Sequence, residues 1–306
     1  MKQLISLTIP VYNEDTNLVN LYSNIKDNLD DKYNFEIIFI DDGSSDKSLD
    51  VIKELKLKDK RVKYISFSRN FGHQYALKAG LDYALGDCVI SMDSDLQHPP
   101  MMISKLLKEW GNGSKIVYTK RKNESDIPVL KFITSKLFYF FLNILSNVKL
   151  EYGIADFRLL DRQVVDVVKK SNESALFLRG LVAWTGFSSK YIMYQPARRF
   201  SGKTKYSLSK MVNMAIDAVT SFSVLPLRFA TMVGFLISLA TGLYAIYAVI
   251  VWLNGYDVII GWPSVIVSIL FIGGMQLMML GILGEYISKI FLESKKRPLY
   301  VIREMK

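Results

Sequence analysis

The chain has 306 residues, of which 50% are hydrophobic and 22% are charged, and its formal net charge at pH 7 is +10. The single cysteine, Cys88, excludes an intramolecular disulfide and fits a reducing compartment. The basic charge suits an anionic membrane surface or phosphorylated substrates. Because the sequence contains no zinc-finger spacing and no known nucleic-acid-binding module, we expect no nucleic-acid partner.

The first 120 residues alternate between short apolar runs and amphipathic segments. The apolar runs predict strands, at residues 4–9, 35–40, 62–67, 87–92 and 115–119. Segments between them, such as 73–85 and 100–110, have the spacing of helices that bury one face. This alternation predicts an α/β domain with a mostly parallel sheet and right-handed crossovers. No G-x-G-x-x-G follows the first strand, so the dinucleotide-binding fingerprint is missing.

Acidic residues follow two of the predicted strands, at the edge where such sheets bind ligands. Asp41 and Asp42 follow the second strand, and Asp93 and Asp95 follow the fourth. Two carboxylates one residue apart can converge on one divalent ion, and oxygen ligands favour Mg²⁺ or Mn²⁺. With the amide oxygen of Gln97, they form the predicted metal site. An Asp-x-Asp sequence alone also occurs in surface loops, but its place at a strand end favours the metal interpretation.

From about residue 128 the sequence becomes apolar with interleaved lysines. Residues 128–146 predict an amphipathic helix that lies in a membrane interface, and residues 206–225 have a similar character. For the first segment taken alone, a buried helix with basic residues facing solvent is an equally good interpretation.

Two later segments, residues 229–253 and 262–286, are long and apolar enough to span a bilayer. Lysine and arginine flank the pair on its outer sides, whereas the link between them has neither, so the positive-inside rule places both termini in the cytoplasm. The alternative is a buried helical hairpin of a soluble protein. The predicted organisation is a cytoplasmic catalytic domain at 1–225, a transmembrane hairpin at 226–290 and a basic cytoplasmic tail at 291–306.

Six motifs together resemble one family. The chain resembles the family 2 glycosyltransferases, which have the GT-A fold, in Thr8-Ile9-Pro10-Val11-Tyr12-Asn13-Glu14, Asp41-Asp42-Gly43-Ser44 and Asp93-Ser94-Asp95-Leu96-Gln97-His98-Pro99. It resembles the polyisoprenyl-phosphate glycosyltransferases in Ala155-Asp156-Phe157-Arg158-Leu159-Leu160, Phe177-Leu178-Arg179-Gly180 and Arg199-Phe200-Ser201-Gly202-Lys203-Thr204-Lys205-Tyr206. That group includes bactoprenol glucosyltransferases of the GtrB type and, more distantly, dolichol-phosphate mannose synthase. The resemblance runs from about residue 4 to residue 298 and says little about the sugar.

The resemblance implies a role for each residue at a matching position. Contacts with the nucleoside of a nucleotide sugar are implied for Pro10, Tyr12, Glu14, Asp41 and Asp42, each of which can also be interpreted as a turn or cap residue. Binding of the diphosphate is implied for the metal residues and for the basic pair Arg199 and Lys205. Binding of the lipid phosphate is implied for Arg121, Lys131 and Ser135. Lys131 stands where some relatives have arginine, which keeps the charge but loses the planar fork.

The candidates for catalysis are Asp95, Arg199 and Asp156. In the bactoprenol branch, the position of Asp156 resembles a proposed general base. A phosphate monoester, however, has a second pKa of about 6 and needs little deprotonation at neutral pH. We therefore expect Asp156 near the reacting groups, where it would position the acceptor, the sugar or the metal.

The predicted reaction is an inverting, metal-dependent transfer of a hexose at the inner membrane. The resemblance favours glucose from UDP-glucose as donor and undecaprenyl phosphate as acceptor, giving a lipid-linked sugar for cell-surface glycan modification. Alternatives left open are another sugar (an N-acetylhexosamine, an aminosugar or mannose from GDP-mannose) and a non-catalytic partner of a flippase. A processive polysaccharide synthase is disfavoured because the sequence has no Arg-Trp dipeptide. Glycines in the two spans permit close helix packing, so we expect a homo-oligomer such as a tetramer.

Overall fold

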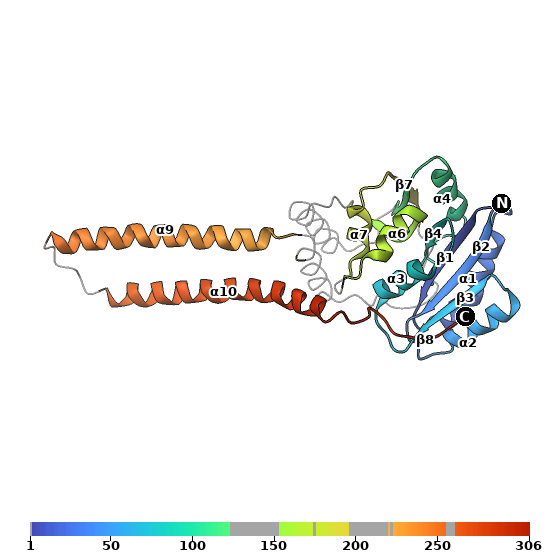
Figure 1. The fold of residues 1–306 in the computed structure, drawn as a ribbon, viewed down its shortest axis with the longest axis horizontal. Helices are drawn as coiled ribbons and strands as arrows, with labels where there is room; N and C mark the ends of the chain where they lie inside the picture. Colours follow the sequence, from blue (N-terminus) through green and yellow to red (C-terminus); the bar gives the residue numbers. More distant parts are fainter. Residues whose placement is uncertain (1, 123–152, 174–175, 196–219, 221–222, 255–260) are drawn as a thin grey trace.

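The computed structural model describes residues 2–122, 153–173, 176–195, 220, 223–254 and 261–306 (Figure 1). Its elements in chain order are β1 (Leu4–Val11), α1 (Asp15–Asp27), β2 (Asn34–Asp41), α2 (Ser48–Lys58), β3 (Val62–Phe67), α3 (His73–Tyr83), β4 (Cys88–Ser91), α4 (Met102–Gly111), β5 (Ile116–Arg121), β6 (Ile154–Asp161), α6 (Arg162–Lys170), α7 (Leu178–Trp184), β7 (Ser189–Tyr194), α9 (Leu225–Leu253), α10 (Trp262–Ser294) and β8 (Ile302–Met305). The predicted α/β fold is confirmed, with a strand at each of the five predicted places. The predicted interfacial helix at 128–146 lies outside the described residues, as does most of 206–225.

Within the described chain, the strands form one sheet of eight, in the order β7-β5-β6-β4-β1-β2-β3-β8. Parallel pairs join β1 to β2 and β4, β2 to β3, and β5 to β7. The two reversed strands are β6, which is antiparallel to β4 and β5, and β8, which is antiparallel to β3. The sheet is therefore mostly parallel, as predicted, and its ligand-binding edge lies at the carboxyl ends of the parallel strands.

The alternation of side chains along β1 explains why helices cover both faces of the sheet. Ile5, Leu7 and Ile9 are fully buried in one core cluster with residues of α1, α2 and α4. The intervening Ser6 and Thr8 point to the opposite face, where α3, α6 and α7 contribute to a second buried cluster. Burial of each such aliphatic side chain contributes about 1.5–3 kcal/mol. The three layers hold the strand ends in fixed positions.

The reversed strand β6 brings another carboxylate to the ligand-binding edge. Its register pairs Arg158 with Ser91, the last residue of β4. Because β6 runs antiparallel to β4, the earlier residue Asp156 lies beyond the end of β4. Asp156 therefore reaches the neighbourhood of Asp93, although the two are 63 positions apart in the sequence.

The last strand, β8, has no clear signal in the sequence. Patterning indicates only a basic tail at 291–306, whereas Ile302–Met305 pairs with β3 as its outer neighbour. The strand is short, and its side chains alternate between half-buried and exposed. It covers the hydrogen-bonding edge of β3. The end of the chain thus belongs to the sheet of the catalytic domain.

Helices α9 and α10 lie side by side as a hairpin that projects from the α/β domain (Figure 1). They contain 29 and 33 residues, and about 20 suffice to cross a hydrocarbon core of about 30 Å. Their most apolar windows have mean hydropathies of 1.5 and 2.0, with 0% of either window buried. The two predicted spans are therefore helical wherever the structure describes them, and their length and exposed apolar surface fit a membrane better than water.

Replacing Gly80 by alanine should destabilise the α/β domain, although alanine is the better helix former. A Cβ atom there would lie 2.8 Å from Cβ of Thr8 and 3.1 Å from Cδ1 of Ile40. Helix α3 would have to move away from the sheet, at a cost of about 1–3 kcal/mol. Thermal unfolding of the detergent-solubilised protein should show a lower Tm. Gly111→Ala is the matched control, because nothing lies within 4 Å of a Cβ there; equal Tm values for the two variants would contradict the close packing.

Candidate active site

The turn after β4 is held in shape by its own side chains and by His98. The backbone N–H of Gln97 donates to Oδ1 of Asp95 at 3.1 Å, and the N–H of Asp93 donates to Nδ1 of His98 at 3.0 Å. His98 is buried and stacks on Phe157, with ring centroids 4.9 Å apart. Burial lowers the pKa of His98, so the neutral ring can accept the bond from Asp93. His98 therefore supports the loop and is poorly suited to carry a proton.

Asp93 has a carboxylate oxygen whose hydrogen-bonding capacity is unused. Its Oδ1 is buried and accepts no hydrogen bond in the described structure, which costs free energy unless a cation lies nearby. Among the described residues, no three His, Cys, Asp or Glu side chains gather as a ready-made metal cage. Mg²⁺ commonly uses one or two protein carboxylates together with waters and substrate phosphates. Asp93, Asp95 and Gln97 thus fit an ion that is held jointly with a diphosphate.

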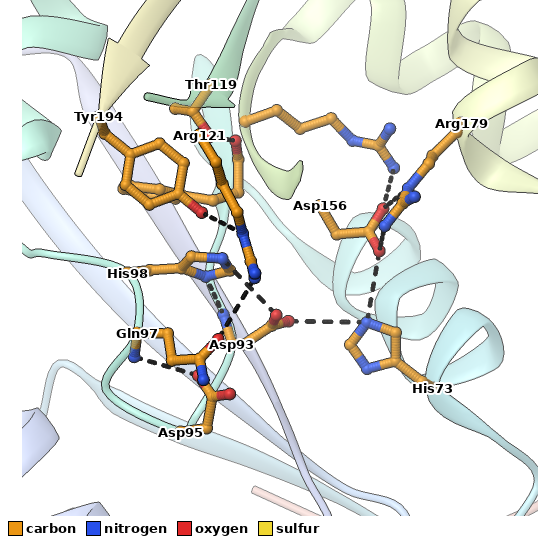
Figure 2. A network of polar contacts seen from close by, with 12 residues as sticks. His73, Asp93, Asp95, Gln97, His98, Thr119, Arg121, Asp156, Arg179 and Tyr194 are labelled. Atoms are coloured by element: carbon orange, nitrogen blue, oxygen red, sulfur yellow. Dashed lines mark hydrogen bonds and ion pairs between the residues drawn. The ribbon is translucent and has the colours of Figure 1, made fainter. Parts of the chain in front are cut away.

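Asp156 is buried, and its carboxylate faces Arg179 and His73 (Figure 2). Arg179 donates two hydrogen bonds to it, from Nε to Oδ1 at 2.9 Å and from Nη2 to Oδ2 at 2.8 Å. Nη2 of Arg158 lies 3.8 Å from Oδ1. Burial by itself would raise the pKa of Asp156, but Arg179, His73 and Arg158 outweigh it and hold the pKa well below its usual range. Asp156 is therefore a fixed anion at neutral pH.

His73 lies between the carboxylates of Asp93, which follows β4, and Asp156, which lies near the start of β6 (Figure 2). Its Nε2 is 3.6 Å from Oδ1 of Asp93 and 3.7 Å from Oδ2 of Asp156. Burial alone would lower the pKa of His73, but these carboxylates outweigh it and raise the pKa. No sequence motif assigns His73 a role. Its position after Gly72, where φ is +113°, indicates only the start of a helix, so the geometry alone identifies it.

Arg121 lies at the carboxyl end of β5 and contacts the predicted metal loop (Figure 2). Its Nη2 donates to Oε1 of Gln97 at 3.3 Å, and its Nε donates to the hydroxyl of Tyr194 at 3.3 Å. Tyr194 comes from β7, is buried, and carries no sequence signal for the site. The structure thus places Arg121 beside the predicted metal residues. The other predicted phosphate-binding residues, Lys131, Ser135, Arg199 and Lys205, lie outside the described residues.

The predicted nucleoside residues lie at and beyond the carboxyl ends of β1 and β2. Tyr12 is 39% exposed, so its ring is accessible to a ligand. Pro10 is buried within β1. Glu14 is the N-cap residue of α1 without a side-chain capping hydrogen bond, and its carboxylate accepts a hydrogen bond from Nδ2 of Asn17 at 2.6 Å.

Asp41 and Asp42 are both buried, and the protein's own loops engage their carboxylates. Asp41 accepts from the N–H of Ser44 at 3.0 Å and from Oγ of Ser66 at 2.8 Å. Asp42 accepts from the N–H of Phe71 at 2.7 Å, and burial raises its pKa. These bonds give both residues a structural role at the turn. Direct contact with a nucleoside stays a prediction for each.

Comparison with known proteins places the chain in a family. The model of glycosyl transferase family 2 matches residues 6–168, and the model of the GtrB C-terminal hairpin matches residues 225–290. A bactoprenol glucosyl transferase of Shigella phage SfV is 41% identical over 303 residues, covering 99% of both chains. A prophage bactoprenol glucosyl transferase homolog of Escherichia coli is 39% identical over 303 residues, again covering 99% of both. The chain belongs to glycosyl transferase family 2, and its predicted resemblance to the GtrB type is confirmed.

Similar solved structures share less with the chain. Mannosyl-3-phosphoglycerate synthase from Rubrobacter xylanophilus has a TM-score of 0.49 at 15% identity, over 71% of this chain and 72% of that one. Glucosyl-3-phosphoglycerate synthase from Mycobacterium tuberculosis, solved with Mn²⁺, UDP and phosphoglyceric acid, has a TM-score of 0.47 at 18% identity, over 71% and 76%.

Removing the carboxylate of Asp156 should destabilise the catalytic domain. Asp156→Ala leaves Arg158, which is 1% exposed, without an anion, and loss of one partner of a buried pair costs about 3–5 kcal/mol. Thermal unfolding should show a large drop in Tm. Asp166→Ala is the control: it breaks a 3.6 Å pair with Arg162, but the side chain of Asp166 is 55% exposed, so little change is expected. A wild-type Tm for Asp156→Ala would show that the cluster does not stabilise the fold.

Proposed function

We propose that the protein transfers glucose from UDP-glucose to a polyisoprenyl phosphate, with undecaprenyl phosphate as the first choice. The observation that carries the proposal is the contact between Arg121 and Gln97. This contact places Arg121, a cation that can bind an acceptor phosphate, beside the residues that could hold a metal ion bound to a diphosphate. Both lie at the ligand-binding edge of the sheet. Full-length relatives named bactoprenol glucosyl transferases support the same sugar and the same lipid.

The acceptor phosphate attacks without help from a protein base. A phosphate monoester is mostly dianionic at neutral pH, because its second pKa is about 6. Asp156 is a poor base, because Arg179 occupies both of its oxygens and its pKa is held low. Its role is to hold Arg179 by two hydrogen bonds and to keep His73 in place beside Asp93. We therefore assign Asp156 a positioning role and not the role of a general base.

Two anionic substrates must be held together, so positive charge and orientation are the main requirements of the site. Arg121 binds the acceptor phosphate, with Lys131 and Ser135 as its predicted partners. Asp93, Asp95 and Gln97 would hold Mg²⁺ or Mn²⁺, which when bound would neutralise charge on the departing diphosphate. Arg199 and Lys205 are the predicted cations on the donor side. The phosphate oxygen attacks the anomeric carbon from the face opposite the diphosphate, which inverts its configuration.

The hairpin serves to hold the site at the surface where the lipid phosphate lies. Helices α9 and α10 span the inner membrane, with the catalytic domain and both termini on the cytoplasmic side, as the flanking lysines and arginines favour. Glycines on the hairpin, such as Gly242, Gly273 and Gly281, have open space where a Cβ would point. These small surfaces support close packing between copies in a homo-oligomer.

A donor screen with the purified protein tests the proposal. With undecaprenyl phosphate and either UDP-glucose, UDP-N-acetylglucosamine or GDP-mannose, mass spectrometry should find one hexose added to the lipid from UDP-glucose. EDTA should abolish the product and Mg²⁺ or Mn²⁺ should restore it. Asp95→Asn should remain inactive with metal added, at roughly wild-type Tm, while Asp166→Asn stays active. Lipid labelled only by another donor would overturn the glucose assignment, and EDTA-resistant transfer would overturn the metal assignment.

Arg121→Ala should mainly weaken use of the lipid acceptor. Loss of a charged contact to a phosphate predicts an increase of about tenfold or more in the KM for undecaprenyl phosphate. Steady-state kinetics with varied lipid at saturating donor checks this. Lys190→Ala removes a similar charge at the other end of the β5–β7 pair, where Lys190 lies opposite Val117, and should leave the KM unchanged. An unaltered acceptor KM in Arg121→Ala would refute its role.

A further inference from the structure

The chain returns from the hairpin to the catalytic sheet on the side of the predicted nucleoside residues. After α10 ends at Ser294, residues 302–305 pair with β3 in antiparallel register, with Ile302 opposite Phe67 and Met305 opposite Ile65. The N–H of Ser68 also donates to the carbonyl of Val301 at 2.9 Å. Strand β8 therefore begins beside the carboxyl end of β3, which is the ligand-binding edge.

Arg303 reaches from β8 to the carboxylate of Asp41. Its Nη2 donates to Oγ of Ser66 at 3.0 Å and lies 3.9 Å from Oδ2 of Asp41. Oγ of Ser66 in turn donates to that same Oδ2 at 2.8 Å. Asp41 is fully buried, whereas the side chain of Arg303 is 49% exposed. Arg303 thus supplies positive charge from the protein surface to a carboxylate at the end of β2.

Tyr300 makes a second connection from the same segment, to the loop that Asp42 holds. Its ring stacks on Phe67 with centroids 4.9 Å apart, and its hydroxyl donates to Asp82 at 2.8 Å. Phe67 meets the ring of Phe71 edge-on at 5.7 Å. The N–H of Phe71 donates to Asp42 at 2.7 Å. Residues 300–305 therefore contact the surroundings of both acidic residues at the end of β2.

We propose that the segment after the second membrane helix completes the nucleoside side of the donor site, with Arg303 as the positioning residue for Asp41. The proposal rests on the proposed function, which uses UDP-glucose as donor, and on the prediction that Asp41 and Asp42 at the end of β2 contact its nucleoside. Arg303 and Ser66 fix the rotamer of Asp41 before the nucleotide arrives. This segment therefore connects the membrane hairpin directly to the proposed nucleotide site.

A purely structural role for β8 makes a different prediction. Covering the edge of β3 requires backbone hydrogen bonds, which side-chain changes at exposed positions leave intact. Met305 is such a position on the same strand, with 53% exposure. If β8 only covers the edge, Arg303→Ala and Met305→Ala should have the same small effects. If Arg303 positions Asp41, the arginine variant alone should weaken nucleotide binding.

The test measures nucleotide binding and turnover with the full-length protein in detergent. We expect Arg303→Ala to raise the Kd for UDP, by calorimetry, and the KM for the donor by about tenfold. The value of kcat and the KM for the lipid should change less than twofold. Arg303→Lys should recover part of the loss, and Met305→Ala should match the wild type.

The binding measurement separates this proposal from the proposed function. A wild-type protein that binds UDP but transfers no sugar would refute the function, while a weaker Kd in Arg303→Ala would still support the role of Arg303. An unchanged Kd and donor KM in Arg303→Ala, or an equal loss in Met305→Ala, would overturn the role of Arg303. A wild-type protein that binds no UDP would overturn both.

Discussion

A carboxylate buried at the edge of a sheet needs compensating charge, because an unpaired buried anion costs several kcal/mol. In the catalytic domain, Asp156 is such a buried carboxylate. Strand β6 runs antiparallel to β4 and so carries Asp156 past the end of β4, where Arg179 reaches it from α7 with two hydrogen bonds. The ion pair thereby joins β6 to α7. His73 extends the charged cluster from α3 to Asp93.

The need for compensating charge also determines what Asp156 can do in the proposed reaction. With its oxygens engaged by Arg179, Asp156 keeps its charge and orients its neighbours, so the proposed mechanism relies on fixed electrostatics more than on proton transfer. Oδ1 of Asp93 accepts no hydrogen bond in the described structure and lies 3.6 Å from Nε2 of His73, and the proposed metal-bound diphosphate would lie beside it. Arg121, the proposed ligand of the acceptor phosphate, contacts the same loop through Gln97. In the proposed mechanism, the metal ion that binds together with the diphosphate would compensate the charge of Asp93.

Much of this fold could be predicted from local pattern. The five predicted strands are visible as apolar runs, and Asp93, Asp95 and Gln97 stand out because they follow such a run directly. The direction of β6 and the pairing of β8 could not be predicted, because they depend on contacts between distant segments. His73 has no motif, and Tyr194 reads as an ordinary strand residue, so only their distances reveal a role. In the sequence, Arg303 cannot be distinguished from the other basic residues of the tail, and only the pairing of β8 with β3 reveals its position.

Transfer by a single displacement determines the anomeric configuration of the product. If the phosphate of the lipid attacks the anomeric carbon directly, UDP-α-glucose must yield a β-linked glucosyl phosphate. The most direct measurement is therefore the anomeric configuration of the purified lipid-linked glucose, determined by NMR from its one-bond carbon–proton coupling. A β-linked product is predicted. An α-linked product would contradict direct displacement, because it requires a second displacement or front-face attack.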